Sequence, residues 1–168
     1  MAQLPDIHTL VPHSGAMSLL TRLLSADAEN LCAEVVITRD SMFCVDGAVG
    51  AWVGVEYMAQ AVAAHAGFVA GLRGERPKVG FLLGTRRYAC ALPAFVAGSV
   101  LHVHVQRALQ GENGLGAFEC RIVDGSSGGD GNVDADGADG ADGAELTTAT
   151  ITVFQPANVE EFLQRSQE

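Results

Sequence analysis

The stretch Ala51-Trp-Val-Gly-Val-Glu-Tyr-Met-Ala-Gln-Ala-Val-Ala-Ala-His65 decides the fold, because it is the most apolar long helical pattern in the chain. A helix that is apolar on almost every side is normally buried. The pattern predicts one long buried helix from about Ala48 to Leu72. Asp46 precedes it and could cap it, because its side chain can accept hydrogen bonds from free backbone N–H groups.

The segments around this helix read mainly as strands. Alternating apolar and polar residues predict an early hairpin, and four further strand patterns follow the helix. A short helix is expected at each end of the chain, over 4–11 and Val159–Ser166. This order predicts an α+β fold, in which an antiparallel sheet wraps around one long central helix. The expected strands are Met17–Leu24, Asn30–Thr38, Lys78–Ala91, Ser99–Leu109, Gly116–Asp124 and Leu146–Phe154.

Length and composition predict a single globular domain over 1–168, because 48% of the 168 residues are hydrophobic. No stretch reaches the length of about 18 uncharged apolar residues that a membrane span needs. The N-terminus lacks the basic and apolar regions of a signal peptide, so we expect a cytoplasmic protein. The net charge of −10 disfavours binding to nucleic acid or to an anionic membrane.

Most of this acidity is local. Seven acids and no base lie in Asp124–Glu145, and the other residues account for only −3 of the net charge. The Gly- and Asp-rich composition predicts a flexible loop over 125–144, between two strands. Part of the loop resembles the start of a calcium-binding loop, but Gly143 stands where the twelfth-position glutamate would be. We expect no metal and no cofactor, because His102 and His104 share a strand face without a third ligand and the four cysteines form no metal-binding spacing.

Glu56 is the unusual residue of the helix. A carboxylate among apolar side chains must reach solvent, be paired, or hold a proton with a raised pKa. Gln60 lies on the same helix face, four residues on, and is expected to support Glu56. Trp52, one turn earlier, could wall a site or belong to the core. His65 lies half a turn away from Glu56, whereas His13 lies on a loop before the first strand.

Two motifs carry a family resemblance. Pro12-His13-x-x-x-Met17-x-Leu19-Leu20-x-Arg22, followed by Val55-Glu-Tyr-Met-Ala-Gln-Ala61, resembles the hotdog-fold 3-hydroxyacyl-acyl-carrier-protein dehydratases, which are FabZ-like. The run Gly80-Phe-Leu-Leu-Gly-Thr-Arg86 is similar to the ApeP-type branch, which is associated with aryl-polyene synthesis. The resemblance covers roughly residues 8–155.

The resemblance implies a dehydratase, a hydro-lyase that converts 3-hydroxyacyl thioesters to trans-2-enoyl thioesters in fatty acid or aryl-polyene-type synthesis. Its partners would be an acyl carrier protein with a phosphopantetheine arm and a second hotdog chain, in a homodimer or a heterodimer. Glu56 would be the acid and His13 the base. The substrate-binding residues would be Gly47, Ala48 and Gly50 at the helix N-terminus, where a backbone N–H polarises the thioester carbonyl, together with Trp52 and Gln60.

The chain departs from the family pattern at one position. The family histidine belongs to a His-Phe-Pro motif fourteen residues before the carboxylate, and that position is Met42. The base could therefore be His13 or come from a partner chain. Two other functions stay open: a thioesterase in which Asp46 or Glu56 activates water, and a non-catalytic acyl-binding subunit of a hetero-oligomer.

Overall fold

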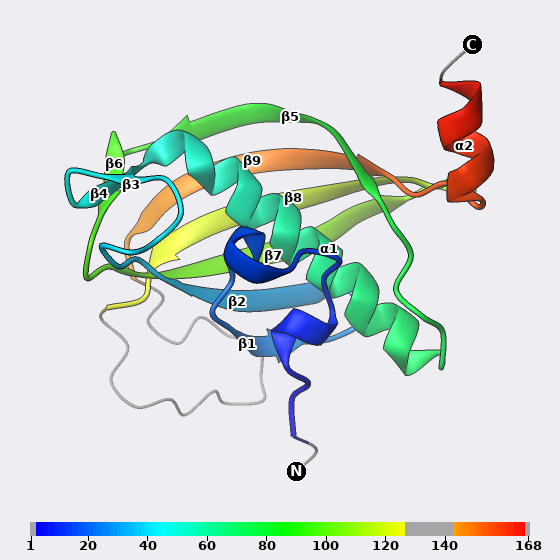
Figure 1. Ribbon diagram of the computed structural model, residues 1–168, viewed down its shortest axis with the longest axis horizontal. Coiled ribbons are helices and arrows are strands. Elements are labelled where there is room, and N and C mark those ends of the chain that lie inside the picture. The colour runs from blue at the N-terminus through cyan, green and yellow to red at the C-terminus, as the bar shows by residue number, and fades with distance from the viewer. Residues whose placement is uncertain (1–2, 127–142, 167–168) are drawn as a thin grey trace.

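A six-stranded antiparallel sheet curves around one long helix in the computed structural model, which describes residues 3–126 and 143–166 (Figure 1). Neighbouring strands are antiparallel throughout the sheet. This architecture confirms the predicted α+β fold. In sheet order the strands are β1 (Arg22–Ala26), β2 (Asn30–Val36), β7 (Val100–Gln110), β8 (Leu115–Asp124), β9 (Glu145–Phe154) and β5 (Phe81–Cys90).

The central helix, α1 (Gly54–Leu72), is covered on two sides. Tyr57, Met58 and Ala61 are buried in the core that α1 forms with the sheet. The N-terminal segment, which includes the short 3-10 turns η1 (Ile7–Thr9) and η2 (Gly15–Met17), crosses another side of the helix (Figure 1). Double coverage explains why the sequence of α1 is apolar almost all round.

The helix begins later than predicted. Asp46 and Gly47 have φ values of +52° and +79° and form the turn between β3 (Cys44–Val45) and β4 (Ala48–Gly50). An Asp-Gly pair favours such a two-residue hairpin, because both positions need positive φ. The 3-10 turn η3 (Ala51–Val53) then leads into α1. Asp46 therefore does not cap the helix, and the predicted start at Ala48 is wrong.

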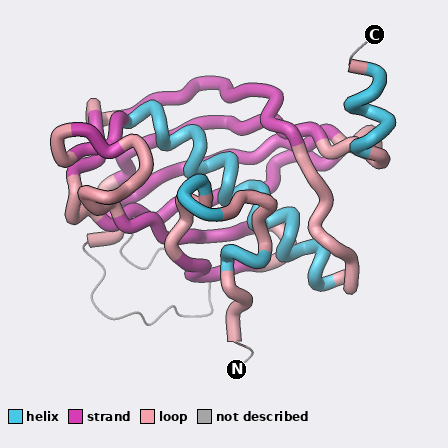
Figure 2. Tube along the Cα trace, in the orientation of Figure 1, coloured by secondary structure: helices cyan, strands magenta, loops and turns pink. Residues whose placement is uncertain are grey.

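Two smaller units complete the fold. β6 (Ala94–Val96) pairs with β4 in a separate three-stranded sheet. The C-terminal α2 (Val159–Arg165) packs Phe162 against the rings of Phe81 and Phe154, with ring centroids 5.2 and 5.3 Å away. Figure 2 shows α2 at the end of the sheet where β9 ends. The predicted strands and tail helix are all present; the first strand starts later than expected because Gly15–Met17 form η2.

Two further predictions can be compared with the described residues only. The expected flexible loop over 125–144 lies almost wholly outside the described residues. Among the helices that are described, neither is both long and apolar enough to cross a lipid bilayer.

Candidate active site

Glu56 lies in the first turn of α1 and has two polar neighbours. Its side chain is 34% exposed. Gln60 follows one turn later on the same helix face, and its Nε2 donates a 2.8 Å hydrogen bond to Oε1 of Glu56. Of the three environments considered for this carboxylate, the structure shows two together, because the side chain both reaches solvent and accepts a hydrogen bond.

The amide of Gln60 is fully buried and held by three hydrogen bonds. Its Oε1 accepts from the backbone N–H of Leu19 at 2.9 Å, and its Nε2 also donates to the carbonyl of Met17 at 2.8 Å. The backbone N–H of Leu19 needs an acceptor, so the amide can sit only with its oxygen toward Leu19 and its nitrogen toward Glu56. Gln60 thus ties the helix to the N-terminal segment and fixes the orientation of Glu56.

His13 reaches Glu56 from the loop between η1 and η2. Its Nε2 lies 3.6 Å from Oε1 of Glu56, and its side chain is 31% exposed. The loop is anchored to α1 on both sides of His13, because Leu10 packs on Gly67 and Gln60 binds the backbone at Met17. The structure therefore brings together His13, Glu56 and Gln60, although 43 residues separate the first two in the sequence.

A cavity of about 160 Å³ opens beside this pair. His13 and Glu56 line it together with Pro12, and most of its remaining wall is apolar. An acid–base pair at the wall of a mostly apolar hollow is suited to proton transfer on a substrate that carries an apolar chain. The polar side chains of Lys78, Gln110 and Gln155 also line it. The remaining lining residues are Ala59, Val62, Ala63, Ala66, Gly80, Phe81, Leu82, Gly114, Gly116, Phe118 and Val153.

The structure does not bring Gly47, Ala48 and Gly50 to this cavity. They lie in the β3–β4 hairpin and in β4, ahead of η3, and not at the N-terminus of α1. Their predicted place at the N-terminus of α1 is therefore wrong, while their role at a thioester carbonyl stays a prediction. The Asp46-Gly47 pair, which is a hairpin signal, could have revealed the later helix start from sequence.

Trp52 is also placed differently from expectation. It is 67% exposed, and it neither lines the cavity beside Glu56 nor belongs to the core. Its indole lies so close to Gly50 that a β-carbon there would clash with Nε1, and its ring meets Phe43 edge-on at 5.5 Å. These contacts hold the ring in place although it faces outward.

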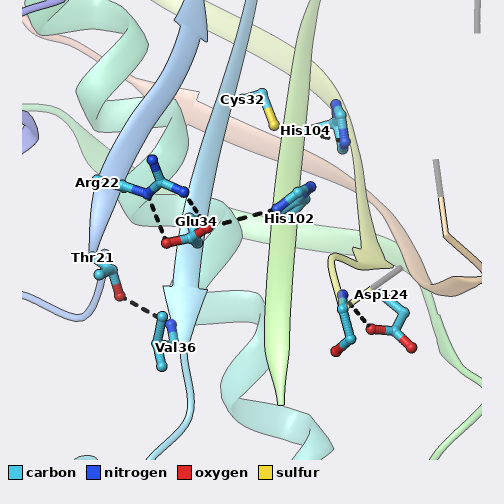
Figure 3. A network of polar contacts seen from close by, with 9 residues as sticks. Thr21, Arg22, Cys32, Glu34, Val36, His102, His104 and Asp124 are labelled. Carbon is cyan, nitrogen blue, oxygen red and sulfur yellow. Dashed lines mark hydrogen bonds and ion pairs between the residues drawn. The ribbon is translucent and has the colours of Figure 1, made fainter. Parts of the chain in front are cut away.

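A second polar cluster lies on the sheet face opposite the core (Figure 3). Arg22 donates two hydrogen bonds to Glu34, of 2.8 and 3.0 Å, and Nε2 of His102 lies 3.8 Å from the same carboxylate. These contacts, the Arg22 hydrogen bonds first, hold the pKa of Glu34 below its usual range. On the same face, Nε2 of His104 lies 3.7 Å from Sγ of Cys32. The sequence placed His102 and His104 on one strand face but did not reveal the contact between His102 and Glu34.

His65 packs inside the fold. It is 1% exposed, its ring meets Phe118 edge-on at 5.7 Å, and burial lowers its pKa. Over residues 3–126 and 143–166, no three histidine, cysteine or acidic side chains cluster closely enough to hold a metal ion.

Known proteins resemble this chain over nearly its whole length. The sequence profile of the ApeP-like family, described as ApeP dehydratase, matches residues 5–164. A chain of the dehydratase heterocomplex ApeI:P from Xenorhabdus doucetiae is 27% identical and superposes with a TM-score of 0.81, covering 99% of this chain and 100% of that chain. No curated protein sequence matches the chain.

More distant structures share the fold alone. AziG from S. sahachiroi is 13% identical with a TM-score of 0.56, covering 80% of this chain and 90% of that one. A hypothetical thioesterase from Streptococcus pneumoniae TIGR4, solved with coenzyme A, is 13% identical with a TM-score of 0.56. The match covers 81% of this chain and 88% of that one. These likenesses confirm the predicted hotdog fold.

Proposed function

Because this chain belongs to the ApeP-like dehydratase family, we propose that it removes water from 3-hydroxyacyl thioesters carried by an acyl carrier protein, in aryl-polyene-type synthesis. The observation that carries the proposal is the His13–Glu56 pair, 3.6 Å apart at the wall of an apolar cavity. Dehydration needs one group that takes a proton from C2 and another that gives a proton to the hydroxyl on C3. A histidine and a carboxylic acid can do both.

The proposed reaction starts with neutral His13 and protonated Glu56. Nε2 of His13 takes the C2 proton, and the electron pair of that C–H bond forms the double bond between C2 and C3. The C3–O bond breaks, and Glu56 gives its proton to the departing hydroxyl, which leaves as water. His13 is then protonated and Glu56 ionised, and a proton passing from His13 to the nearby carboxylate restores the starting state.

Gln60 supports this reaction as a positioning residue. Both of its amide N–H groups are used, one on Met17 and one on Oε1 of Glu56. Oε1 therefore acts as an acceptor, and the proton of the acid belongs on Oε2. We propose that this arrangement turns the acidic O–H toward the substrate hydroxyl.

A second hotdog subunit is the proposed protein partner. Within the part of the chain that is described, β5 pairs with β9 alone, and Leu82 and Leu83 on β5 are exposed. Further exposed apolar side chains lie around the small sheet, at Val45, Trp52 and Val96. The similar protein from Xenorhabdus doucetiae is part of a dehydratase heterocomplex. We propose that these surfaces meet another hotdog chain.

The test is a dehydration assay with the purified chain, alone and with a co-expressed hotdog partner. The reagent is a 3-hydroxyacyl-acyl-carrier-protein, and the product is the enoyl thioester, measured by mass spectrometry. The proposal predicts enoyl product without release of free thiol. Free acid and free thiol would instead identify a thioesterase. Product that forms only with the partner, and that survives loss of Glu56, would identify this chain as a non-catalytic subunit.

A further inference from the structure

A second hollow, of about 170 Å³, lies beside α1 and closer to the C-terminal end of the helix than the active-site cavity, the one beside His13 and Glu56. On α1, the active-site cavity is lined by residues between Glu56 and Ala66, and the second hollow by residues between His65 and Arg73. The two spaces therefore follow one another along the helix, and their boundary lies near Ala66.

The ring of Phe118 lies at this boundary. Phe118 belongs to β8 and is buried in the core between the sheet and α1. Its Cε2 lies 3.5 Å from the place that a β-carbon on Gly116 would take, and Gly116 lines the active-site cavity alone. Its ring also meets the ring of His65 edge-on at 5.7 Å, and His65 lines the second hollow alone. The ring of Phe118 thus lies between the two spaces.

Gly116 leaves room on the near side of this ring. It is buried and precedes Phe118 by two residues on β8, so both positions face α1. Its φ is not in the left-handed region, so its backbone conformation does not require glycine. No close backbone contact requires it either, since the nearest backbone atom given for its β-carbon position, the carbonyl oxygen of Leu109, is 3.7 Å away. A glycine inside a strand often marks a place where a ligand approaches closely.

The helix side of the active-site cavity suits a hydrocarbon. Ala59, Ala63 and Ala66 recur at three- and four-residue spacing after Glu56 and line the cavity with it. Their methyl groups offer no hydrogen bonds, so an apolar chain loses nothing by lying along them. From Glu56 to Ala66 the helix rises about 15 Å. A chain whose reacting carbons lie at Glu56 and that extends toward Ala66 would reach the ring of Phe118.

We propose that Phe118 is the stop that limits the length of the acyl chain, and that Gly116 provides the room for the last carbons before it. The inference rests on the proposed function, because it assumes that the reacting carbons lie at His13 and Glu56. It adds a specificity determinant: the enzyme selects apolar acyl chains up to one maximum length, set from β8.

The experiment measures the binding of saturated acyl-pantetheine thioesters of increasing chain length to the full chain, with the hotdog partner present if the wild type needs it. These compounds carry no hydroxyl on C3, so isothermal titration reports binding without reaction. Each added carbon should tighten binding by about fourfold while it is buried in the cavity. The gain should stop at one length, which is the limit that Phe118 imposes. A gain that continues evenly over the whole series, or affinity that does not depend on length, would overturn the proposal.

Two variants should move the limit in opposite directions. Phe118→Leu shortens the stop and opens the space toward the second hollow, so the first chain beyond the wild-type limit should bind about fourfold more tightly than to the wild type. Gly116→Ala adds one methyl group to the cavity wall, beside the side chains of Val153 and Phe118. The longest chain that the wild type accommodates should therefore bind to it about fourfold more weakly.

Phe95→Leu is the matched control. Phe95 is 1% exposed and lines neither space, so its substitution removes a similar ring from the core without changing the limit. Urea unfolding shows which variants are folded. An unchanged limit in folded Phe118→Leu would overturn the assignment, and so would an equal shift in Phe95→Leu. If Phe118→Leu does not fold, an unchanged limit in Gly116→Ala overturns it.

The same chain lengths are then assayed as 3-hydroxyacyl thioesters. If a length limit appears in binding and moves with Phe118→Leu, but no compound is dehydrated, the proposed function fails while the role of Phe118 stands. If the compounds are dehydrated, but the limit is absent or does not respond to the variants, the role of Phe118 fails while the proposed function stands.

Discussion

The backbone carbonyl of Leu10 occupies the space that a β-carbon on Gly67 would need. Gly67 lies inside α1, where glycine costs about 0.5–1 kcal/mol relative to alanine. The contact explains the glycine, because it lets the N-terminal segment lie directly on the helix. His13 follows Leu10 by three residues, so this close approach also helps to set the position of the proposed base.

Gly67→Ala should therefore destabilise the protein and slow its reaction. The added methyl group meets backbone and not a flexible side chain, and overpacking of this kind costs about 1–3 kcal/mol. Gly71→Ala is the matched control, since nothing lies within 4 Å of its β-carbon position on the same helix. Urea unfolding should show a lower free energy of unfolding for Gly67→Ala and a free energy of unfolding up to about 1 kcal/mol higher for Gly71→Ala. Equal effects of the two changes would contradict the close packing of Leu10.

Gln60→Leu should lower kcat more than it changes KM. The substitution frees Glu56 from its fixed orientation, and a misplaced acid costs about ten- to a hundredfold in rate. It also leaves the Leu19 N–H and the Met17 carbonyl without their partner, which should cost about 1–3 kcal/mol of stability. Steady-state kinetics and urea unfolding measure the two effects. Gln164→Leu, on an exposed face of α2, is the control. A normal kcat in a destabilised Gln60→Leu would remove Gln60 from the mechanism.

The buried His65 should make stability depend on pH near neutrality. Burial lowers its folded-state pKa below the ordinary value of 6.5, so the unfolded chain takes up a proton first as pH falls. The free energy of unfolding should be highest above about pH 6.5 and decline below it, by at most about 1.4 kcal/mol per pH unit. His65→Phe should flatten this decline, while His8→Gln, at an exposed position, should not. Denaturant titrations from pH 7.5 to 5 make the comparison.

Glu34 should also make the free energy of unfolding depend on pH, but at lower pH than His65. Here the cause is a favourable contact of the charged group and not burial. Its pKa is held below the ordinary value of 4.5, chiefly by the Arg22 hydrogen bonds. Its stabilising effect is thus complete above about pH 4.5 and is lost as pH falls through the folded-state pKa. Glu34→Gln should lower the free energy of unfolding by about 1 kcal/mol at neutral pH. It should not lower it at a pH where Glu34 is protonated in both the folded and the unfolded chain. Glu112→Gln, in an exposed turn, should leave the free energy of unfolding unchanged at every pH. A constant difference between wild type and Glu34→Gln across the titration would refute the ion pair.

The sequence predicted the fold, and the closeness of Glu56 and Gln60, for identifiable reasons. Periodicity alone places Glu56 and Gln60 on one helix face, since residues four apart are neighbours. The long strands of the main sheet follow from alternation and turn residues. The position of His13 beside Glu56 depends on how the N-terminal segment lies across α1, and this tertiary contact has no local signal.

Two errors have different origins. The late start of α1 was predictable in principle, because Asp46-Gly47 is a hairpin pair that competes with a helix cap. The exposure of Trp52 was not predictable from the sequence, because an apolar residue beside a buried helix is normally part of the core. Its ring is held by Gly50 and Phe43 on a surface that is proposed to meet a partner subunit.

The most direct test of the central claim is the initial rate of enoyl formation by Glu56→Gln, measured beside Glu112→Gln and the wild-type chain, with the partner present if the wild type needs it. The substitution keeps the size of the side chain but removes the proton that Glu56 is proposed to give to the leaving hydroxyl. We predict a loss of at least about a hundredfold for Glu56→Gln, with unchanged unfolding, and a normal rate for Glu112→Gln. A Glu56→Gln protein that still forms enoyl product at the wild-type rate would contradict the account.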